Sequence, residues 1–514
     1  MSFNFDSLHG LTGTLSKQEE NKLKRKVSYM QLDVELSKRV SHAQGLIYDK
    51  FDGLNEGSRA KMDMTKTFAK GVIESGATRV EVESVEGFKV GQELTVYDNL
   101  LSEHKILSAI SSEQSNDWST FSAGVANGLA VKNDGTLWAW GYNHLGQLGN
   151  GTTTEEHSPI QIGTDTNWKV AVGYSSQSFA IKTDGTLWSW GYNANGQLGH
   201  GDTTNLLIPK KVGTDTNWKS VSSGQFHTLA IKEDGTLWAW GYNNYGQVGD
   251  GTNNFSYIPK KIGTDTNWKQ VSARANHSIA LKTDGSLWGW GHNVSGELGD
   301  GTNTNTNIPK KIGTATDWKE ISAGNGFTLA IKNDGKVWGW GINNYGQLAD
   351  NRTSNNFLSP IQIGTATDWK GISAGNGFTL AIKNDGTLWG WGYNVNGQLG
   401  DGTTTSPVTA PKQIGTDTDW KTVSPGNSFT LALKNDGTLW AWGNNTYGRL
   451  GDGTTDAKLV PSPTGFLFLL EFDTPIEGTF KPKAGIARTN AEIKDGELVF
   501  GKWRGQGFVI KEVN

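Results

Sequence analysis

Hydrophobic and polar positions alternate through the middle of the chain in a pattern that returns about every fifty residues. In the stretch that starts at Trp218, a strand-like run at 228–232 is followed by Asp234-Gly235 and then by the run 237–240, Leu-Trp-Ala-Trp. Asp-Gly is a strong hairpin signal because glycine adopts positive φ without strain. Residues two apart lie on one face of a strand, so the two tryptophans share a face. The pattern predicts two antiparallel strands.

The residues on either side of this hairpin predict two more strands. Val221-Ser222 leads into a turn at Ser223-Gly224, and a Gly-rich turn occupies 241–252. The segment 259–263, Pro-Lys-Lys-Ile-Gly, closes the unit, and its proline suits an outer strand because proline cannot donate to a sheet ladder. Each unit is therefore expected to be one four-stranded blade.

This unit occurs seven times, and each copy carries the pattern Asp-Gly-x-(Leu/Val)-Trp-x-Trp-Gly. The copies begin at Asp134, Asp184, Asp234, Asp284, Asp334, Asp385 and Asp436. A single blade cannot bury both of its faces, whereas a ring of blades buries them against neighbours. Repetition at this period therefore predicts a β-propeller. Three tryptophans in each unit supply a large apolar area for the contacts between blades.

The repeat resembles that of the regulator-of-chromosome-condensation family. The resemblance rests on Trp238-Ala239-Trp240-Gly241 and on the turn Gly-Gln-Val-Gly-Asp-Gly at 246–251, and the repeats cover about 350 residues. It implies a seven-bladed β-propeller. The family often has a histidine nine residues after each leading tryptophan, where this chain has Asn127, Gln177, His227, His277, Phe327, Phe378 and Phe429, so five of the seven positions depart from it. The Gly-Asp-Gly turn also changes, at His200 and at Ala349, Asn351 and Arg352.

Four regions separate by composition, and the fold class expected is mainly β. Residues 1–70 predict a long helix between Glu19 and Gly45, which would attach the protein or bring copies of it together. Residues 71–113 predict a small β module. Residues 114–465 hold the propeller, and residues 466–514 predict a short C-terminal β extension.

One segment of the small β module resembles modules in tail and adsorption proteins of bacterial viruses. It runs from Val85 to Asp98. This resemblance implies a part of a virus particle, with the small module on the attachment side of the molecule.

Charge and cysteine content remove several classes of function. The net charge of −4 gives no general attraction to nucleic acid or to anionic membranes. No stretch approaches the roughly 20 apolar residues of a membrane span, and residues 1–16 do not form a signal peptide. The chain has no cysteine, which excludes disulfides and thiolate chemistry. We expect neither nucleic-acid binding nor membrane insertion.

The candidate chemistry is sparse. The carboxylates of Asp250, Asp300, Asp401 and Asp452 recur in Gly-Asp-Gly-Thr turns, but Ca²⁺ needs six to eight oxygen ligands. Turn formation is the favoured interpretation. His227 and His277 occupy equivalent positions in adjacent units, with no further metal ligand evident. Phosphate loops and nucleophile motifs are absent. We therefore predict no catalytic residue, no metal, no cofactor and no enzymatic activity.

Candidate binding residues lie where the repeats differ from one another. One set falls between the Gly-rich turn and the following proline: Leu206, Leu207, Phe255, Tyr257, Phe357 and Leu358. The other set falls six to nine residues after the leading tryptophan: Tyr174, Phe226, Arg274 and His277. Exposed aromatic and apolar residues on loops are frequent contact residues, although drift among tolerant loops gives the same pattern.

These observations lead to a prediction of function. We predict a non-enzymatic structural protein of a bacteriophage tail, located in the virion. Residues 1–113 would bind other tail proteins, and the propeller loops would bind a host surface protein or glycan. The alternative is a bacterial interaction protein, an adhesin or an enzyme inhibitor, at the cell surface or outside the cell. Nucleotide exchange on a small GTPase, known in the family, depends on particular loops and is disfavoured.

The first blade has no proline-containing strand before Trp118. We therefore expect the segment 459–465 to close the ring by joining the first blade.

Overall fold

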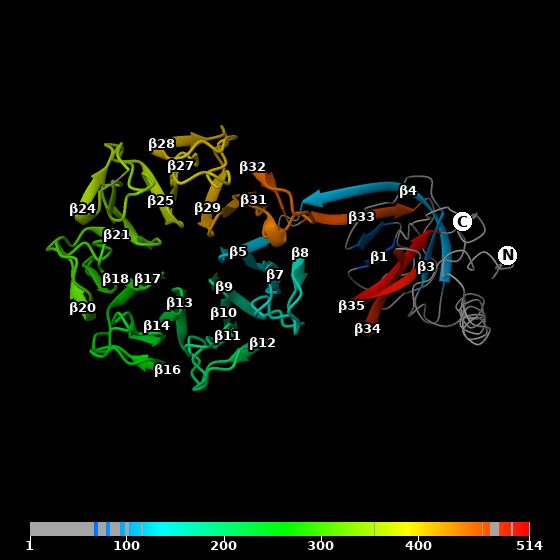
Figure 1. Cartoon of the computed structure of the whole chain (residues 1–514), viewed down its shortest axis with the longest axis horizontal. Helices are drawn as coiled ribbons and strands as arrows, with labels where there is room; N and C mark the ends of the chain where they lie inside the picture. The colour runs from blue at the N-terminus through cyan, green and yellow to red at the C-terminus, as the bar shows by residue number, and fades with distance from the viewer. Residues whose placement is uncertain are drawn as a thin grey trace. The chain divides into compact units, whose positions relative to one another are not determined.

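The structure is a computed structural model that describes residues 117–353 and 355–464 with their side chains, together with the backbone of seven further strands. The chain divides into two compact units, residues 114–465 and residues 1–113 with 466–514. The first unit contains seven antiparallel sheets of four strands each. This confirms the predicted seven-bladed propeller (Figure 1).

Each blade is built from four consecutive strands. The inner strands are β5 (Trp118–Ala123), β9 (Trp168–Tyr174), β13 (Trp218–Ser223), β17 (Trp268–Arg274), β21 (Trp318–Ala323), β25 (Trp369–Ala374) and β29 (Trp420–Pro425). The second strands are β6 (Asn127–Lys132), β10 (Gln177–Lys182), β14 (His227–Lys232), β18 (His277–Lys282), β22 (Phe327–Lys332), β26 (Phe378–Lys383) and β30 (Phe429–Lys434).

The third strands are β7 (Leu137–Gly141), β11 (Leu187–Gly191), β15 (Leu237–Gly241), β19 (Leu287–Gly291), β23 (Val337–Gly341), β27 (Leu388–Gly392) and β31 (Leu439–Gly443). The outer strands are β8 (Glu156–Gln161), β12 (Leu206–Lys211), β16 (Ser256–Lys261), β20 (Thr306–Lys311), β24 (Phe357–Ile363), β28 (Val408–Ile414) and β32 (Lys458–Pro463). A short 3₁₀ helix, η3 (Thr446–Gly448), lies in the last blade. The inner strands converge at the centre of the ring and the outer strands lie at its periphery (Figure 1).

The Asp-Gly hairpin between the second and third strands has a clear local cause. In blade 3, Asp234 Oδ1 accepts hydrogen bonds from the backbone N–H of Thr236 at 3.0 Å and from its hydroxyl at 2.6 Å. That hydroxyl in turn accepts from Nε1 of Trp238 at 2.9 Å. Gly235 has a φ of 74°, and a Cβ there would lie 2.1 Å from the carbonyl oxygen of Thr266. The turn therefore requires glycine and orients the tryptophan that follows it.

The core lies between the blades. The second tryptophan of each third strand is fully buried, and in blade 3 Trp240 packs with Phe179 and Leu198 of blade 2 and with Trp218 of its own blade. At roughly 25 cal/mol per Å², burying one such side chain contributes about 4–6 kcal/mol as an upper bound. Each blade interface is thus stabilised chiefly by its own set of apolar side chains.

Neighbouring blades are also joined by a repeated backbone contact, which we call the loop latch. The loop after each third strand extends over the next blade, where Nε1 of Trp240 donates to the carbonyl oxygen of Gln197 at 2.8 Å. The same loop donates from the N–H of Gly201 to the carbonyl of Tyr257 at 2.8 Å. The tryptophan contact recurs at Trp140, Trp190, Trp240, Trp290, Trp340, Trp391 and Trp442.

The seventh latch closes the ring. Nε1 of Trp140 in blade 1 donates to the carbonyl oxygen of Arg449 in blade 7 at 3.0 Å, and the N–H of Gly453 donates to that of His157 at 3.0 Å. The expectation that the segment 459–465 joins the first blade is wrong, because β32 pairs with β31 inside blade 7. Closure uses the same loop contacts as every other interface.

The second unit contributes one sheet. Its strands are β1 (Lys66–Ala69), β2 (Arg79–Val82), β3 (Glu93–Tyr97), β4 (Ser102–Gln114), β33 (Phe466–Phe472), β34 (Lys483–Lys494) and β35 (Glu497–Glu512). Their order is β1-β2-β33-β4-β3-β35-β34, and β35 also pairs with β1. Strands that precede the propeller in the sequence and strands that follow it therefore belong to one sheet. The predicted helix between Glu19 and Gly45 lies outside the described residues, and the small β module stays a prediction.

Candidate functional site

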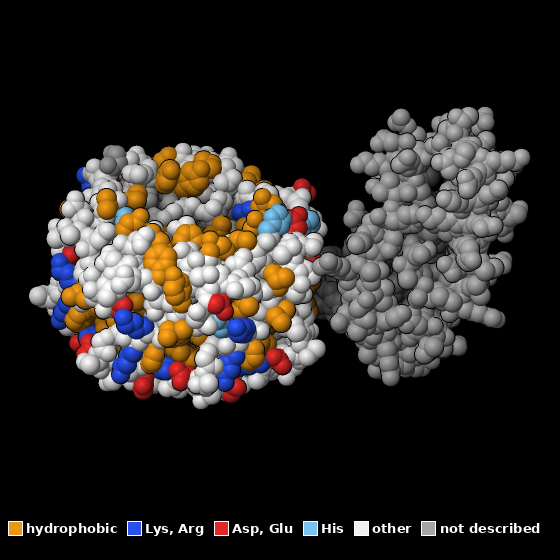
Figure 2. All heavy atoms as spheres, turned by 60° about the horizontal axis from the view of Figure 1, so that its bottom comes forward, with side chains coloured by type: hydrophobic (Ala, Val, Ile, Leu, Met, Phe, Trp, Pro, Cys, Tyr) orange, Lys and Arg blue, Asp and Glu red, His pale blue; other side chains and the backbone are white. Residues whose placement is uncertain are grey.

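The blade topology sorts the connections onto two faces of the propeller. The turns between the first and second strands and the long loops between the third and outer strands emerge together on the loop face. In blade 3 these are residues 224–226 and 242–255. The Asp-Gly turns and the connections to the next blade emerge on the opposite, turn face. Hydrophobic and uncharged side chains cover the upper part of the propeller in Figure 2, and charged side chains gather toward its lower rim.

The first set of predicted contact residues lies where the loops enter the outer strands. Leu206 and Phe357 are partly buried against the blade cores. Leu207, Tyr257 and Leu358 are exposed by 39 %, 42 % and 38 %. The backbone carbonyls of these three residues accept the latches from Gly151, Gly201 and Gly301, each at 2.8 Å. Their backbone therefore holds the blades together while their side chains stay accessible.

Arg274 belongs to the second predicted set, and the structure gives it another role. Its Nη1 donates to the carbonyls of Ala374 at 2.9 Å and Pro425 at 3.1 Å, and its Nη2 donates to that of Gly426 at 2.9 Å. Its guanidinium carbon lies 4.6 Å from the ring centroid of Tyr174. These partners come from blades on other sides of the ring, so the side chain crosses the centre of the propeller. Because Arg274 is buried, it is removed from the candidate contact surface.

His277 is buried as well, and so is its equivalent, His227. Each uses Nε2 to contact a hydroxyl of the next blade at 3.0 Å, Ser278 for His227 and Thr328 for His277. Those hydroxyls donate to backbone carbonyls, so they accept from the histidine N–H. Burial lowers the pKa of His227 to about 3 and that of His277 to about 4, which keeps both neutral near pH 7. His277 therefore joins blades and does not face a partner.

Phe226 and the aromatic residues of the long loops form a continuous patch on the loop face. Seven rings from blades 2 to 4 make up this aromatic cluster: Tyr192, Phe226, Tyr242, Tyr245, Phe255, Tyr257 and His292. The ring centroid of Tyr242 lies 4.9 Å from that of Phe255 and 6.3 Å from that of Phe226. All seven side chains are exposed or half-buried.

The sequence alone pointed to only three of these rings, Phe226, Phe255 and Tyr257. Three of the other four, Tyr192, Tyr242 and His292, occupy the position directly after Trp-x-Trp-Gly, which also varies to Ile342 and Asn444. Tyr245 lies three residues further along the loop, at a position that also varies between blades. That variation inside an otherwise constant motif was the available signal. The contacts between loops of different blades decide which of these positions meet.

A pocket of about 540 Å³ lies on the same face between blades 4 and 5. Its lining is mostly polar and consists of Ser295, Ile342, Asn344, Arg352, Asn355, Asn356 and Phe357. Arg352 pairs with Asp350 at 2.8 Å, and its guanidinium carbon lies 5.7 Å from the ring centroid of Phe357. The predicted residue Phe357 thus borders a polar recess rather than an apolar contact surface.

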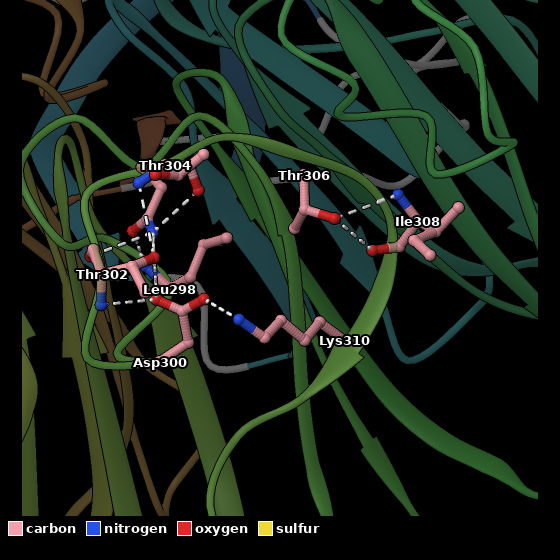
Figure 3. A network of polar contacts seen from close by, with 8 residues as sticks. Leu298, Asp300, Thr302, Thr304, Thr306, Ile308 and Lys310 are labelled. Carbon is pink, nitrogen blue, oxygen red and sulfur yellow. Dashed lines mark hydrogen bonds and ion pairs between the residues drawn. The ribbon is translucent and has the colours of Figure 1, made fainter.

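The Gly-Asp-Gly-Thr turns hold their carboxylates in protein contacts (Figure 3). Asp300 Oδ1 accepts from the N–H of Thr302 at 3.0 Å, from its hydroxyl at 2.7 Å and from Asn293 at 3.1 Å, while Oδ2 pairs with Lys310 at 2.5 Å. Burial opposes ionisation, but the hydrogen bonds from Lys310 and Thr302 outweigh it and lower the pKa of Asp300. These contacts agree with the turn interpretation.

Residues 117–353 and 355–464 contain no group of three or more His, Cys, Asp or Glu side chains placed to hold a metal ion. No helix in the described part of the chain is long and apolar enough to cross a membrane.

The model of the RCC1-like domain matches residues 89–367 and 258–478, which together cover more than half of the chain. This chain belongs to the RCC1-like domain family. Human protein RCC2 is 43 % identical over 93 residues, which are 18 % of this chain and 17 % of RCC2. The ultraviolet-B receptor UVR8 of Arabidopsis thaliana is 39 % identical over 93 residues, 18 % of this chain and 21 % of the receptor. The chain spans between 9 % and 21 % of the length of such curated relatives.

Solved structures share the RCC1-like propeller fold. Human WBSCR16 superposes with a TM-score of 0.59 and 21 % identity, covering 66 % of this chain and 99 % of that protein. Prp20p of Saccharomyces cerevisiae superposes with a TM-score of 0.55 and 21 % identity, covering 62 % of this chain and 84 % of Prp20p. At this identity the likeness establishes the fold.

The predictions of a bacteriophage tail function and of a location in the virion are wrong. The relatives of this RCC1-like chain are proteins of human, mouse, zebrafish, Arabidopsis thaliana and yeast, and none of those named here is a component of a virus particle. They do not support the resemblance of Val85–Asp98 to tail proteins, nor the alternative of a bacterial adhesin or inhibitor. The short resemblance at 85–98 misled the functional prediction, while the long one through the repeats was correct.

Proposed function

We propose that this RCC1-like protein is a non-enzymatic binding protein whose loop face holds a folded protein partner. The aromatic cluster on blades 2 to 4 is the observation that carries the proposal. Tyrosine and phenylalanine are rigid and bury a large area for little loss of side-chain entropy, and tyrosine dominates many protein interfaces. A continuous surface of seven rings on three adjacent blades suits such an interface.

The loops that present these rings are held in place before any partner arrives. Asn243 Oδ1 accepts from the N–H of Val248 at 2.9 Å, and its Nδ2 donates to the carbonyls of Thr252 and Asn254, each at 3.0 Å. The N–H of Gly251 then donates to the carbonyl of Asn307 in the next blade at 2.8 Å. A surface ordered in advance loses less conformational entropy on binding.

The charges of the loop face favour uncharged contacts. The carboxylates of Asp250, Asp300 and Asp401 are each neutralised by a lysine of the outer strand at 2.5–2.6 Å. Few free charges then remain to steer a partner. Binding at the aromatic cluster should therefore depend weakly on salt, in contrast to association steered by charge.

Two further observations support a binding role. Two histidines with strongly lowered pKa values on this side, His227 and His277, are engaged in contacts between blades rather than facing solvent. Among structures of similar fold, that of Prp20p is described with its binding to Gsp1p and histones, and yeast RCC1 is described bound to Kap60. Protein binding by such propellers is the class of function that we carry over.

The test compares two double variants with the same kind of change on the same face. Phe226→Ser with Tyr242→Ser removes two central rings of the aromatic cluster. Tyr345→Ser with Tyr393→Ser removes a pair on blades 5 and 6, whose ring centroids lie 4.7 Å apart. Binding of the full chain to purified Gsp1p and to histones is measured by biolayer interferometry at two salt concentrations.

We expect the first variant to weaken binding by about tenfold or more, as for central aromatic contacts, and the control to change it by less than about threefold. Equal weakening in both variants, or no saturable binding of the wild-type chain to either probe, would contradict the proposal. Circular dichroism melting checks that both variants fold.

A further inference from the structure

Lysines form a series at the inner end of the turn face. Each inner strand begins with a buried tryptophan, and in six of the seven blades the next residue is an exposed lysine. We call this series the inner lysine arc: Lys169, Lys219, Lys269, Lys319, Lys370 and Lys421. In blade 1 the position is Ser119, whose hydroxyl donates to the carbonyl of Val131 at 2.8 Å, so the arc is open there.

The repeat places these lysines around one axis. The inner strands of neighbouring blades contact one another all the way around the ring. Each lysine follows the tryptophan that starts its strand, at the turn-face end, and the strand register shifts at this residue, as between Trp218 and Ser220. Six ammonium groups therefore surround the centre of the turn face.

The acidic groups of the neighbouring connections already have partners. A second series of lysines ends each second strand, and in blade 3 Lys232 pairs with Asp215 at 2.6 Å and lies 3.8 Å from the ring centroid of Trp238. An ion pair between this lysine and an aspartate just before the leading tryptophan occurs in all seven blades, with the aspartate either three residues or one residue before that tryptophan. Within residues 117–353 and 355–464, no ion pair joins a lysine of the arc to a carboxylate. The one carboxylate beside the arc on a described inner strand is Glu320, which follows Lys319; burial raises the pKa of Glu320, and the charge of Lys319 opposes that rise. The other five lysines of the arc are followed by uncharged residues.

Apart from Glu320 on β21, the next carboxylates lie further from the axis. Asp184, Asp234 and Asp284 occupy the turns between second and third strands, so at about 4.8 Å per strand they lie roughly 7 Å or more from the inner strand. Hydrogen bonds from Thr236 lower the pKa of Asp234, and the lysines that add to this effect are Lys232 and Lys261, from the second and outer strands. The turn face is therefore positive at its centre and acidic around it, over a distance close to the Debye length of about 8 Å at physiological salt.

We propose that the inner lysine arc binds a compact anion carrying several phosphate groups, on the axis of the propeller at the turn face. A compact polyanion contacts several ammonium groups at once and stays inside the ring of carboxylates. A duplex nucleic acid extends across that ring and meets Asp184, Asp234 and Asp284. Lysine suits the role because its ammonium group offers three donors on a flexible stem.

The experiment uses the full chain, with inositol hexakisphosphate as the probe and isothermal titration calorimetry at 0.15 M salt as the measurement. The test variant is Lys169→Gln, Lys219→Gln and Lys269→Gln together. The matched control is Lys211→Gln, Lys261→Gln and Lys311→Gln, which removes the same charge from the outer strands of the same three blades. Inorganic phosphate and a short DNA duplex are titrated in parallel.

We expect saturable binding of inositol hexakisphosphate that the test variant weakens by about 10- to 100-fold and the control by less than about threefold. Inorganic phosphate should bind far more weakly. The proposal is overturned if the wild-type chain does not bind the probe, if both variants lose affinity equally, or if the duplex binds more tightly than the probe. Five of the six substituted lysines are exposed and Lys211 is half-buried, and melting curves check that both variants fold.

Discussion

Blades 3 and 5 have the same four strands and the same buried tryptophans but differ at their turns and at one contact between blades. Blade 3 carries His227, Thr236 and Gly251, where blade 5 carries Phe327, Lys336 and Asn351. Nevertheless Trp240 and Trp340 are both fully buried, and both donate to a carbonyl of the preceding blade at 2.8 Å. The comparison separates the frame, by which we mean the buried tryptophan and its latch that every blade has, from the turn and histidine positions that differ between blades.

The largest effect should come from the frame itself. Trp240→Ala and Trp340→Ala each remove a buried indole and a latch donor, and each should lower the free energy of unfolding by about 3–5 kcal/mol. Urea unfolding monitored by tryptophan fluorescence gives the values. If blade 5 were only loosely held, the loss at Trp340 would be smaller than that at Trp240 by more than about 1 kcal/mol.

The pH dependence of stability should distinguish the blades next. His227 has a folded pKa of about 3, below the unfolded value of about 6.5, so its folded state disfavours protonation. Its contribution to stability is complete above pH 6.5 and declines as the pH falls toward 3. Between pH 7 and pH 5, His227 should therefore lower the free energy of unfolding by up to about 2 kcal/mol. The variant His227→Phe, which has the residue that blade 5 carries at this position, should not show this decrease. His277, with a pKa of about 4, should act likewise.

Urea midpoints of the wild-type chain and of the variants His227→Phe and His277→Phe, measured at both pH values, test this expectation. If the variant that carries both substitutions had the same pH dependence of the urea midpoint as the wild-type chain, groups other than these histidines would govern acid unfolding. Phe327→Tyr in blade 5 controls for repacking at the same position without a titrating group in this range.

A smaller effect should follow from the hairpin of blade 5. Thr236 accepts from Trp238 Nε1, whereas Lys336 has no hydroxyl and Trp338 Nε1 is buried without a hydrogen-bond partner. Lys336→Thr should therefore stabilise the protein by about 1 kcal/mol, the usual net value of such a bond. The reverse change, Thr236→Lys in blade 3, should cost a similar amount. If Lys336→Thr raised neither the melting temperature nor the urea midpoint, the missing hydrogen bond of Trp338 would not explain the difference between the two hairpins.

The smallest effect should come from the altered turn. Asn351 has a φ of 64° at the position where Gly251 has 81°. Asn351→Gly should stabilise by about 0.5 kcal/mol because glycine adopts this conformation without strain. Asn351→Ala should instead destabilise by about 1 kcal/mol, since alanine lacks asparagine's tolerance of it. The difference between the two variants in thermal unfolding is the measurement, and its reversal would rule out the backbone explanation.

The sequence predicted the ring because the period, the Asp-Gly hairpins and the paired tryptophans are local signals repeated seven times. It did not predict the latches, because Trp240 and Gln197 lie in different blades and meet only when the ring is formed. Arg274 was taken for a loop contact for the same reason. Its position varies between repeats, and only the geometry of the ring brings Ala374, Pro425 and Gly426 around it.

The candidate site was predicted in part. Phe226, Phe255 and Tyr257 were chosen because repeats differ there, and the structure brings them together with Tyr242. Tyr242 was overlooked because it directly follows the motif that specifies the fold and is tyrosine in four of the seven blades. The functional prediction failed on physical grounds too, since a fourteen-residue stretch at 85–98 fixes neither a binding surface nor a partner.

All seven latches run in the same direction, which has a consequence for the order in which the molecule forms during synthesis. Six of the seven tryptophans that donate to a latch carbonyl lie 43 or 44 residues after that carbonyl in the sequence. Trp140 instead precedes its partner Arg449 by 309 residues. The first blade leaves the ribosome before the other six and completes its last contact only after Arg449 has been synthesised. In a nascent chain that stops before Arg449, Trp140 of blade 1 has no carbonyl partner from blade 7. By the same geometry, a circularly permuted gene that starts between any two blades encodes the same seven contacts and moves only the late one.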